Sequence, residues 1–374
     1  MKGRETAAYI NIDKYLENLN YIQNQTKAHI IPVLKANAYG HGMLPLAMQV
    51  FKEGYSMLAV AYLEEALEIL NRGIHLPILI FNYFSPDDFK ELLEFAHFLR
   101  PTITSSTFLE KVCDILGKDV DKFKFHINVD TGINRIGIKE EKLPQLIKLI
   151  KDRNIQIEGV YSHFANADEK DDFTRVQFGK YKGLLDYIIG SGIDVEKKHI
   201  SNSAAALFFS EYSLDYVRPG IATYGLQPST TYEIDQLKPI LELKSLVANI
   251  QNLQPNDTIG YGRTYEVQKR MKTAIVPIGY ADGYFRALSN KGEVLINGKR
   301  SKILGRVSMD QIVVDVTDNN VSLGDEVVII GRQKYDQITA EEVAENASTI
   351  NYEVTSRIAQ RVRRIYIKGG KYFE

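Results

Sequence analysis

The sequence predicts an α/β protein of two domains, an N-terminal (β/α)8 TIM-like barrel and a C-terminal domain built mainly of β-strands. A chain of 374 residues with 44% apolar content exceeds one comfortable hydrophobic core. From about residue 29 to 225, short β-rich runs alternate with longer helical patterns, which is typical of βα units around a parallel sheet. After about residue 226, strand patterns follow one another without helices between them.

The barrel prediction depends on a count of strands. The β-rich runs cover residues 29–34, 57–61, 77–83, 99–104, 123–129, 155–162, 198–201 and 215–218. Helical patterns between them are clearest at 63–71 and 173–189. Eight strands, each with a following segment, predict a barrel of about 200 residues, which is a normal size for this fold.

The second domain is predicted from strand patterns separated by turn signals. The strand patterns cover residues 241–253, 273–279, 293–307, 311–316 and 326–331, with turns at 254–257 and 297–298. One helix near 338–346 and a final strand near 361–367 complete it. The change of period divides the chain into domains 1–230 and 231–374, and residues 1–12 are candidates for pairing with the β domain.

Composition excludes several classes of function. Lys and Arg number 46 against 47 Asp and Glu, so the net charge of -1 offers no broad field for nucleic acid or an anionic membrane. No run approaches the ~20 apolar residues of a membrane span, and the first residues lack a signal peptide's apolar core, which predicts a cytoplasmic protein. The lone Cys113 is predicted to be a packed helix residue, and we expect no metal site.

Polar residues at the ends of the predicted strands mark a candidate active site. In a (β/α)8 barrel the catalytic side chains lie at the C-terminal ends of the strands. The residues that end or follow a strand are Lys35, Asn128, Asp130, His163, Asn202, Ser203 and Arg218. Alone, a strand-end lysine is usually a solvated charge and a strand-end serine is usually a helix N-cap. Together these side chains are expected to face one mouth of the barrel.

Two segments at this mouth indicate pyridoxal phosphate (PLP). Lys35 follows a very apolar strand, so it can be partly desolvated, which lowers the pKa of its amine and makes it a Schiff-base former. Gly220 allows a close backbone approach, and the N–H groups of Gly220 and Ile221 are expected to be free to cradle a phosphate. The last two strands are the usual phosphate site of this fold. A reactive lysine facing a phosphate cradle describes PLP.

Eight longer segments, spread over both domains, resemble the alanine racemase family, which is PLP-dependent and of fold type III. They are VLKANAYGHG (33–42), VDTGINRIG (129–137), YSHFANAD (161–168), RPGI (218–221), GYGRTY (260–265), IGYADG (278–283), GRVSMDQ (305–311) and TINYE (349–353). The resemblance covers almost the whole chain. It implies a cytoplasmic homodimer with shared active sites that interconverts L- and D-alanine and supplies D-alanine for peptidoglycan.

The same resemblance implies the residues that hold the cofactor. Lys35 would carry PLP, and its phosphate would be bound by Tyr39, Ser203, Gly220, Ile221 and Tyr352. Arg218 would meet the pyridine nitrogen. A guanidinium stays charged and donates without giving up a proton, so the ring remains a weaker electron sink. Return of the proton to Cα is then favoured over transamination.

Further residues are assigned to the substrate by resemblance. Arg135 would contact the phenolic oxygen of the cofactor and the substrate carboxylate, which the backbone of Met309 would also hold. His163 would bridge Arg218 and Tyr261. Supporting positions are Asn128, Tyr280 and Asp310.

Racemisation needs a base on each face of the substrate, and one lysine cannot reach both. By resemblance Lys35 serves the D face, and Tyr261 serves the L face from the β domain of a second subunit. A free tyrosine pKa of about 10 must then be lowered by cationic neighbours. The alternative is that Gly260-Tyr261-Gly262 is a bulge beside a packed aromatic, since the chain has 22 tyrosines.

One position departs from the family pattern. Many members carry a carbamylated lysine that braces the arginine corresponding to Arg135, whereas this sequence has Asn128. A neutral amide cannot supply the missing negative charge. Two hypotheses remain: Asn128 hydrogen-bonds the arginine directly, or a bound chloride takes the place of the charge.

Three alternative functions were weighed. A non-catalytic PLP-binding barrel shares the lysine and the phosphate cradle but normally lacks a second domain. A decarboxylase of basic amino acids has the same architecture but uses a cysteine acid, for which Cys113 is badly placed. A serine-preferring or broad-specificity racemase is harder to separate. Tyr280, Met309 and Tyr352 would leave a pocket fit for a methyl group, and an apolar pocket rejects a hydroxyl only weakly.

Overall fold

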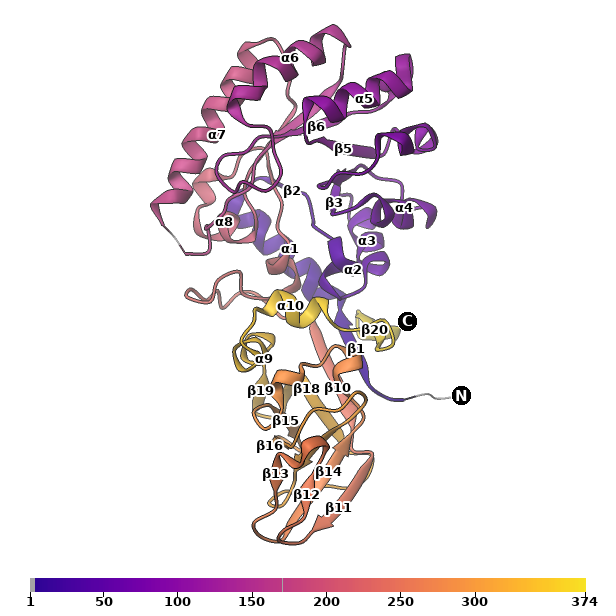
Figure 1. Cartoon of the computed structure of the whole chain (residues 1–374), viewed down its shortest axis with the longest axis vertical. Coiled ribbons are helices and arrows are strands. Elements are labelled where there is room, and N and C mark those ends of the chain that lie inside the picture. Colours follow the sequence, from indigo (N-terminus) through magenta and orange to yellow (C-terminus); the bar gives the residue numbers. More distant parts are fainter. Residues whose placement is uncertain (1–3, 170) are drawn as a thin grey trace.

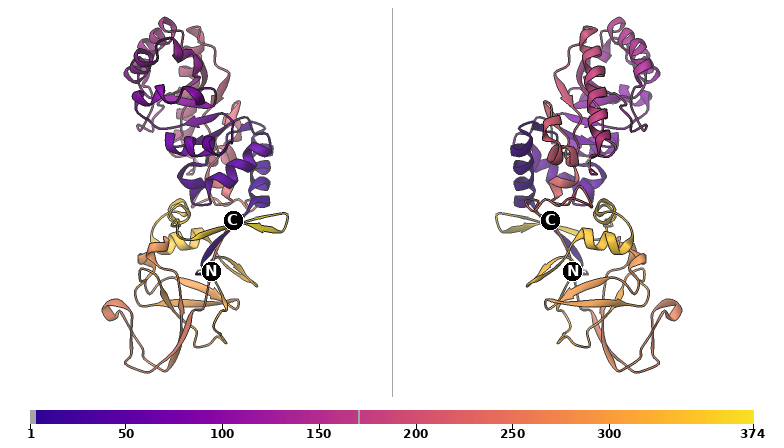
Figure 2. Two further views of the ribbon diagram at one scale, coloured as in Figure 1. Left: turned by 90° about the vertical axis from the view of Figure 1, so that its right-hand side faces the viewer. Right: turned by 90° about the vertical axis from the view of Figure 1, so that its left-hand side faces the viewer.

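The computed structural model describes residues 4–169 and 171–374 and has two parts stacked along its long axis (Figure 1). The upper part is a ring of parallel strands surrounded by helices, and the lower part is mainly β-sheet. Both predicted parts are therefore confirmed. The side views show that the C-terminal segment returns to the junction between them (Figure 2).

Eight parallel strands form the barrel in the order β2-β9-β8-β7-β6-β5-β4-β3. Their bounds are β2 (His29–Ile30), β3 (Leu58–Val60), β4 (Ile78–Ile80), β5 (Leu99–Ile103), β6 (Phe125–Asn128), β7 (Ile157–Tyr161), β8 (Lys197–His199) and β9 (Tyr216–Val217). The ring closes through a parallel bridge between Val33 and Ala59, where Ala59 N–H donates to the Pro32 carbonyl at 2.9 Å. Every predicted barrel strand is present but shorter than its apolar run.

Helices cover the outside of the barrel. They are α1 (Ile12–Thr26), α3 (Met43–Lys52), α4 (Leu63–Asn71), α5 (Ser106–Leu116), α6 (Leu143–Asp152), α7 (Asp172–Gly190) and α8 (Ser203–Phe208). Each buries one apolar stripe; in α6 the stripe is Leu143, Leu146, Ile147 and Ile150, at helical spacing. The prediction for α4 matches its observed bounds. Cys113 is buried on α5, as predicted.

The β domain contains an 11-stranded sheet and one small hairpin. Its strands are β1 (Ala7–Asn11), β10 (Leu241–Leu246), β11 (Asn249–Leu253), β12 (Thr258–Ile259), β13 (Tyr265–Glu266), β14 (Met271–Val276), β15 (Glu293–Ile296), β16 (Lys299–Leu304), β17 (Ile312–Asp315), β18 (Glu326–Gln333), β19 (Asp336–Ile338), β20 (Arg363–Lys368) and β21 (Lys371–Phe373). Two helices, α9 (Ala340–Ala347) and α10 (Asn351–Ser356), lie near the barrel.

Two predicted strand patterns in this domain are each two strands. The pattern 241–253 divides because β10 pairs with β1 and β18, whereas β11 pairs with β14. The pattern 293–307 folds into the hairpin β15–β16. Asn297 and Gly298 form its turn with positive φ angles of 55° and 80°, which suits a two-residue hairpin.

The junction between the domains is formed from both ends of the chain. Strand β1 precedes the barrel in sequence but lies between β10 and β20 in the sheet of the β domain. The first three residues lie outside the described part. Helix α10 packs on the short segment α2 (Lys35–Tyr39) of the barrel. The β domain therefore contacts the barrel where Lys35 is located.

Asn18 fastens this junction from α1. It is buried, its Oδ1 accepts from Lys238 N–H at 2.9 Å, and its Nδ2 donates to the carbonyls of Thr223 and Lys238. These partners lie on the segment that leads from the barrel to the β domain. One side chain thus satisfies several backbone groups that water cannot reach.

We expect Asn18→Leu to lower the free energy of unfolding by about 1–3 kcal/mol, because the Thr223 carbonyl loses its partner while staying buried and Lys238 N–H loses its acceptor. Urea unfolding followed by circular dichroism measures this. The exposed Asn20 on the same helix gives a matched control, Asn20→Leu. Equal stability of the two variants would contradict the anchoring role.

Candidate active site

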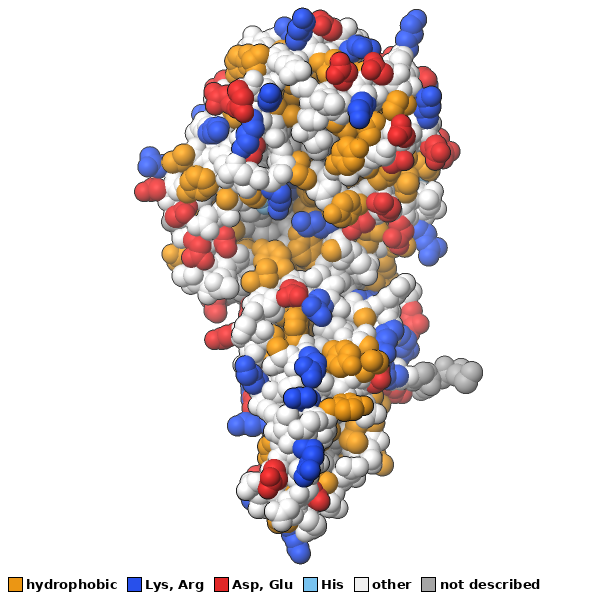
Figure 3. All heavy atoms as spheres, viewed as in Figure 1, with side chains coloured by type: hydrophobic (Ala, Val, Ile, Leu, Met, Phe, Trp, Pro, Cys, Tyr) orange, Lys and Arg blue, Asp and Glu red, His pale blue; other side chains and the backbone are white. Residues whose placement is uncertain are grey.

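A cavity of about 430 Å³ opens at the C-terminal ends of the barrel strands. Its lining includes Lys35, Tyr39, Asn128, Arg135, His163, Asn202, Ser203, Arg218, Gly220, Ile221 and Tyr352, all of which were predicted site residues. In Figure 3 this face of the barrel is hollowed, with basic side chains beside the hollow. No Asp or Glu is among the described lining residues, so the cavity suits anionic groups.

Lys35 begins a turn of unusual handedness. The φ angles of Ala36, Asn37, Ala38 and Tyr39 lie between 52° and 54°, so four consecutive residues other than glycine are left-handed. This conformation costs roughly 1–2 kcal/mol per residue for L-amino acids. It persists only because surrounding contacts stabilise it.

Contacts from within the barrel hold this turn. Glu65 of α4 accepts from Ala36 N–H at 2.6 Å and from Ala61 N–H at 2.8 Å. Asn37 accepts from Met43 N–H through its side chain. The buried imidazole of His41 approaches the carbonyls of Ala38 and Tyr39 through Nδ1. Burial lowers the pKa of His41 to about 4, so it is neutral and donates to them.

The C-terminal segment holds the end of the turn. Gly40 has a φ of 83°, and a Cβ at this position would lie 1.9 Å from the Thr355 carbonyl oxygen of α10. Arg364 donates to the Gly40 carbonyl from Nε and Nη2, at 3.2 and 3.1 Å. Its Nη1 also donates to the carbonyls of Ala359 and Val362. The orientation of the lysine loop therefore depends on the β domain.

The pKa of Lys35 is lowered from its ordinary value. Burial is the largest cause, and the positive charges of Arg135 and Arg218 add to it, while Glu65 acts in the opposite direction. Lowering the pKa enlarges the fraction of neutral amine, which is the nucleophilic form. This is the electrostatic environment that was expected for a Schiff-base lysine.

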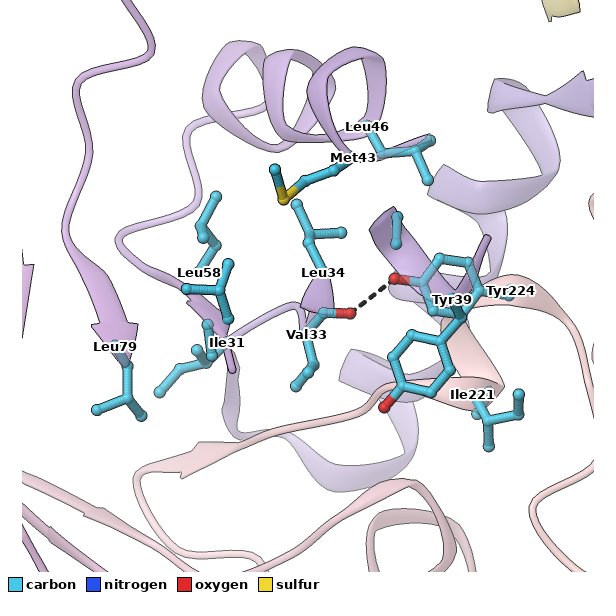
Figure 4. Packing of buried hydrophobic residues seen from close by; sticks show 14 of the residues in the cluster. Ile31, Val33, Leu34, Tyr39, Met43, Leu46, Leu58, Leu79, Ile221 and Tyr224 are labelled. Carbon is cyan, nitrogen blue, oxygen red and sulfur yellow. Dashed lines mark hydrogen bonds between the residues drawn. The ribbon is translucent and has the colours of Figure 1, made fainter. Parts of the chain in front are cut away.

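The opposite side of the cavity is formed by Tyr39 and the 220 turn. A Cβ at Gly220 would lie 2.2 Å from the Tyr39 hydroxyl, so only glycine leaves room here. The rings of Tyr39 and Tyr224 lie next to each other, and Tyr224 donates to the Val33 carbonyl at 2.7 Å (Figure 4). One prediction is wrong: Gly220 N–H is not free, because it donates to Ser203 Oγ at 2.9 Å.

Arg218 is buried and fixed at the floor of the cavity. Its Nη1 lies 2.7 Å from His199 Nδ1, and its Nη2 donates to the Ser162 carbonyl at 2.6 Å. Nη2 also approaches Nδ1 of His163 at 3.4 Å. Burial and the charges of Arg218, Arg135 and Lys35 lower the pKa of His163 well below its ordinary value, so His163 is neutral.

Asn128 does not bind the arginine as one hypothesis expected. Its Nδ2 donates instead to the backbone carbonyl of Ile136 at 3.2 Å. Asp130, the other polar residue at the end of β6, does not line the cavity. It forms an ion pair with Lys139 and accepts from Gly132 N–H. Arg135 itself is exposed at the rim of the cavity.

The remaining predicted residues do not line this cavity. Tyr261 and Met309 lie on the β domain with 73% and 52% of their surface exposed. Tyr280 and Asp310 lie on the same domain, where Tyr280 N–H donates to Ser308 and Asp310 pairs with Arg361. Tyr261 lies in the loop between β12 and β13, the two strands of the small hairpin of the β domain.

Sequence reasoning missed several residues of the site. Tyr62, Phe81, Asn82 and Tyr161 also line the cavity. Glu65, His126 and His199 support residues that do. A signal exists for His126, which interrupts the apolar strand run 123–129 with a buried polar residue; His199 follows Lys197 and Lys198 and carries no such signal.

The fold and the cavity define the class of protein. A half-buried lysine with a lowered pKa faces a tyrosine and a glycine turn across a basic cavity, and these residues fit PLP, since a neutral amine suits its aldehyde and a basic wall without a described carboxylate suits its phosphate. The class is a PLP-dependent enzyme of the (β/α)8 type with a second, β-rich domain.

Comparison with known proteins agrees. Residues 10–228 match the family model for the alanine racemase N-terminal domain, and residues 240–366 match that for the C-terminal domain. Alanine racemase of Carboxydothermus hydrogenoformans is 40% identical over 97% of this chain and all of its own length. That of Halothermothrix orenii is 42% identical over 97% of both chains.

A solved structure gives the same result. The crystal structure of alanine racemase from Bacillus anthracis with bound L-Ala-P has a TM-score of 0.93 and 37% identity, and covers 100% of this chain and 98% of its own. The chain belongs to the alanine racemase family, whose members are PLP-dependent isomerases.

The family match also separates the alternatives. The matched C-terminal domain distinguishes the chain from a PLP-binding barrel without a second domain. Cys113 lies on α5 and does not line the cavity, which argues against the decarboxylase. The relatives named above are alanine racemases, which favours alanine over serine.

No helix among residues 4–169 and 171–374 has both the length and the apolar character needed to cross a membrane. No group of three or more His, Cys, Asp or Glu in that part of the chain is arranged to hold a metal ion.

We predict that Arg135→Gln raises the pKa of Lys35 in the apoprotein, because it removes a positive charge that disfavours the protonated amine. Glu65→Gln is the control of opposite sign and should lower that pKa further. The rate at which PLP binds covalently to each apoprotein is measured against pH, and the midpoint of that profile gives the pKa of Lys35. Identical midpoints in wild type and both variants would refute the electrostatic account.

Proposed function

We propose that the chain interconverts L- and D-alanine with two bases from different subunits, Lys35 on the D face and Tyr261 of a second copy on the L face. When bound, PLP supplies the electron sink that acidifies the Cα proton of the amino acid. Removing that proton from one face and returning it on the other requires two bases.

The observation that carries this proposal is the position of Tyr261. Its exposed ring lies on the β domain and does not line the cavity of its own barrel. The contacts of α10 and Arg364 with the Lys35 loop hold the two domains in this arrangement. A second copy placed with its β domain over the barrel mouth supplies the missing base. Exposed Met309 would enter the same site and offer its backbone to the substrate carboxylate.

The remaining residues have roles in binding and orientation. Arg135 binds the substrate carboxylate, and its position at the rim lets it approach an anion that enters from outside. Tyr39, Ser203, Ile221 and Tyr352 hold the phosphate, while Gly220, whose N–H donates to Ser203 Oγ, leaves room for the Tyr39 hydroxyl. Arg218 donates to the pyridine nitrogen. His163, neutral and 3.4 Å from Arg218, connects Arg218 to Tyr261 of the second copy.

The larger context is part of the same proposal. The protein acts as a homodimer with shared sites in the cytoplasm, and its D-alanine is used for peptidoglycan. The resemblance of both domains to alanine racemases supports this assignment.

Tyr261→Phe keeps the ring and removes its proton carrier. We expect PLP binding to survive and racemisation to fall by about 10²- to 10⁴-fold, as for a lost acid or base. Exchange of the Cα proton of D-alanine with solvent deuterium, which Lys35 catalyses, should persist better than exchange of L-alanine. An equal loss of both exchange rates would contradict the assignment of Lys35 to the D face and Tyr261 to the L face.

Mixed dimers test the two-subunit site. Lys35→Ala chains should lose the visible absorption of bound PLP, and mixing them with Tyr261→Phe chains should restore some activity, because one site of each mixed dimer has both bases. Lys35→Ala mixed with Tyr39→Phe is the control: both residues belong to the same barrel, so each barrel of the mixed dimer carries one defect and no activity should be recovered. No recovery in verified mixed dimers would place Tyr261 in its own subunit's site.

We also propose that a chloride ion lies near Asn128. Lys35, Arg135 and Arg218 give the cavity a positive charge, and no described lining residue is acidic. The Asn128 amide is already directed at the Ile136 carbonyl and brings no charge. A small anion beside Arg135 would compensate the charge that other family members obtain from a modified lysine.

Replacing chloride by a large, weakly binding anion at constant ionic strength should therefore lower the activity of the wild-type protein. Asn128→Asp, which carries its own charge, should respond much less, and the comparison of the two kcat values is the measurement. If both proteins respond equally, the chloride proposal is rejected, and the hydrogen bond from Asn128 to the Ile136 carbonyl is all that remains for this residue.

A further inference from the structure

A row of buried polar side chains runs through neighbouring barrel strands to Arg218. Glu158 of β7 contacts Arg100 of β5 through Oε2, 2.8 Å from Nε. The same oxygen lies 3.1 Å from Nε2 of His126 on β6. Nδ1 of His126 lies 3.0 Å from Nε2 of His199 on β8, and Nδ1 of His199 lies 2.7 Å from Arg218 Nη1. All five side chains are buried.

Hydrogen-bond chemistry permits one direction along this row. Burial alone would raise the pKa of Glu158, but hydrogen bonds from His126 and Arg100 outweigh it and hold that pKa far below its ordinary value. An ionised carboxylate only accepts, so His126 donates from Nε2. Burial lowers the pKa of both histidines, so each is neutral with one acceptor nitrogen. His199 must therefore donate from Nε2 and accept from Arg218 at Nδ1.

The opposite direction would place two donors against each other. A proton on His126 Nδ1 would point at His199, whose own proton would then sit on Nδ1 and face the Arg218 guanidinium. Arginine has no acceptor, so this contact would be repulsive. The direction of the row thus decides whether Arg218 has a partner at Nη1.

The surrounding backbone leaves room for these rings. A Cβ at Gly159 would lie 2.5 Å from Cε1 and Nδ1 of His126. The ring of Tyr161 stacks on His199 with centroids 5.0 Å apart and an angle of 7°, and it lies 4.9 Å from the Arg218 guanidinium. The imidazoles and the guanidinium are therefore fixed in place as well as hydrogen-bonded.

We propose that Glu158 is a positioning residue for Arg218: through His126 and His199 it fixes the hydrogen-bond direction that presents the His199 Nδ1 lone pair to the guanidinium. Arg218 is then held as a donor with its remaining N–H groups available to the cavity. No proton moves along the row. The inference rests on the proposed function, in which Arg218 donates to the cofactor ring.

The positions of the protons are tested directly by nitrogen NMR. In the holoenzyme labelled with ¹⁵N-histidine, we expect His126 and His199 to be neutral and to carry their protons on Nε2. His126→Gln removes one of the seven histidine signals and so assigns it. A proton on Nδ1 of either ring would overturn the proposal whatever the activity.

Two substitutions at His126 test the consequence for catalysis. The amide of His126→Gln offers a donor to Glu158 and an acceptor to His199, so this variant should keep most of the activity. His126→Leu offers neither and should lower kcat by roughly 10- to 100-fold with little change in KM, as for other lost orienting partners. The His199 signals should shift in the leucine variant only. If its kcat and His199 signals equal the wild type, the proposal is wrong.

Arg100→Gln is the matched control, since it removes the other hydrogen bond to Glu158 Oε2 and leaves the row to Arg218 intact. It should lower thermal stability without changing kcat; a kcat loss equal to that of His126→Leu would show a merely structural effect. Arg218→Lys distinguishes a failure of the proposed function of Arg218 from a failure of the positioning role of Glu158. Full activity of Arg218→Lys would overturn the proposed function of Arg218, whereas an impaired Arg218→Lys beside a fully active His126→Leu would overturn only the positioning role.

Discussion

The left-handed turn after Lys35 is the constraint on which the rest of the site depends. The four residues that follow Lys35 (Ala-Asn-Ala-Tyr, 36–39) adopt a left-handed conformation that L-amino acids disfavour. The turn therefore exists only through contacts with other parts of the chain. Glu65 binds its beginning, and Arg364 and α10 bind its end. The second of these contacts comes from the β domain. A barrel without that domain would lose the support that directs Lys35 into the cavity.

The charges of the site are also divided, with the basic residues on the wall of the cavity and the buried carboxylate of Glu158 outside it. The cavity holds Lys35, Arg135 and Arg218 with no described acidic residue on its wall, so it binds the anionic phosphate and carboxylate and lowers the pKa of Lys35. Glu158 pairs directly with Arg100 and Lys197 and is connected to Arg218 only through the two imidazoles, outside the cavity. Arg218 is thus held by neutral acceptors, His199 at Nη1 and the Ser162 and Ile200 carbonyls at Nη2.

The sequence allowed the fold to be predicted wherever a local pattern reports the environment of a residue. The barrel strands and α4 were found because their burial repeats along the chain. The run 241–253 was not divided, since its pattern continues while the pairing partner changes from β18 to β14. The left-handed turn was invisible because nothing in Ala-Asn-Ala-Tyr favours it. Strand-end polarity found the cavity, but not the row at His126, which is formed by single residues from separate strands.

The same junction that orients Lys35 also supports the proposal that a second copy completes the site. Arg364 donates to the Gly40 carbonyl, and the Thr355 carbonyl packs against Gly40. A rotation of the β domain toward its own barrel mouth would therefore break the contacts that hold the turn after Lys35. Tyr261 and Met309 both stay exposed on the β domain and outside this cavity. Large exposed apolar side chains can mark an interaction surface. In the proposed mechanism the contact that directs Lys35 into the cavity would therefore also hold Tyr261 away from it within one chain, and the two bases would meet only between two chains.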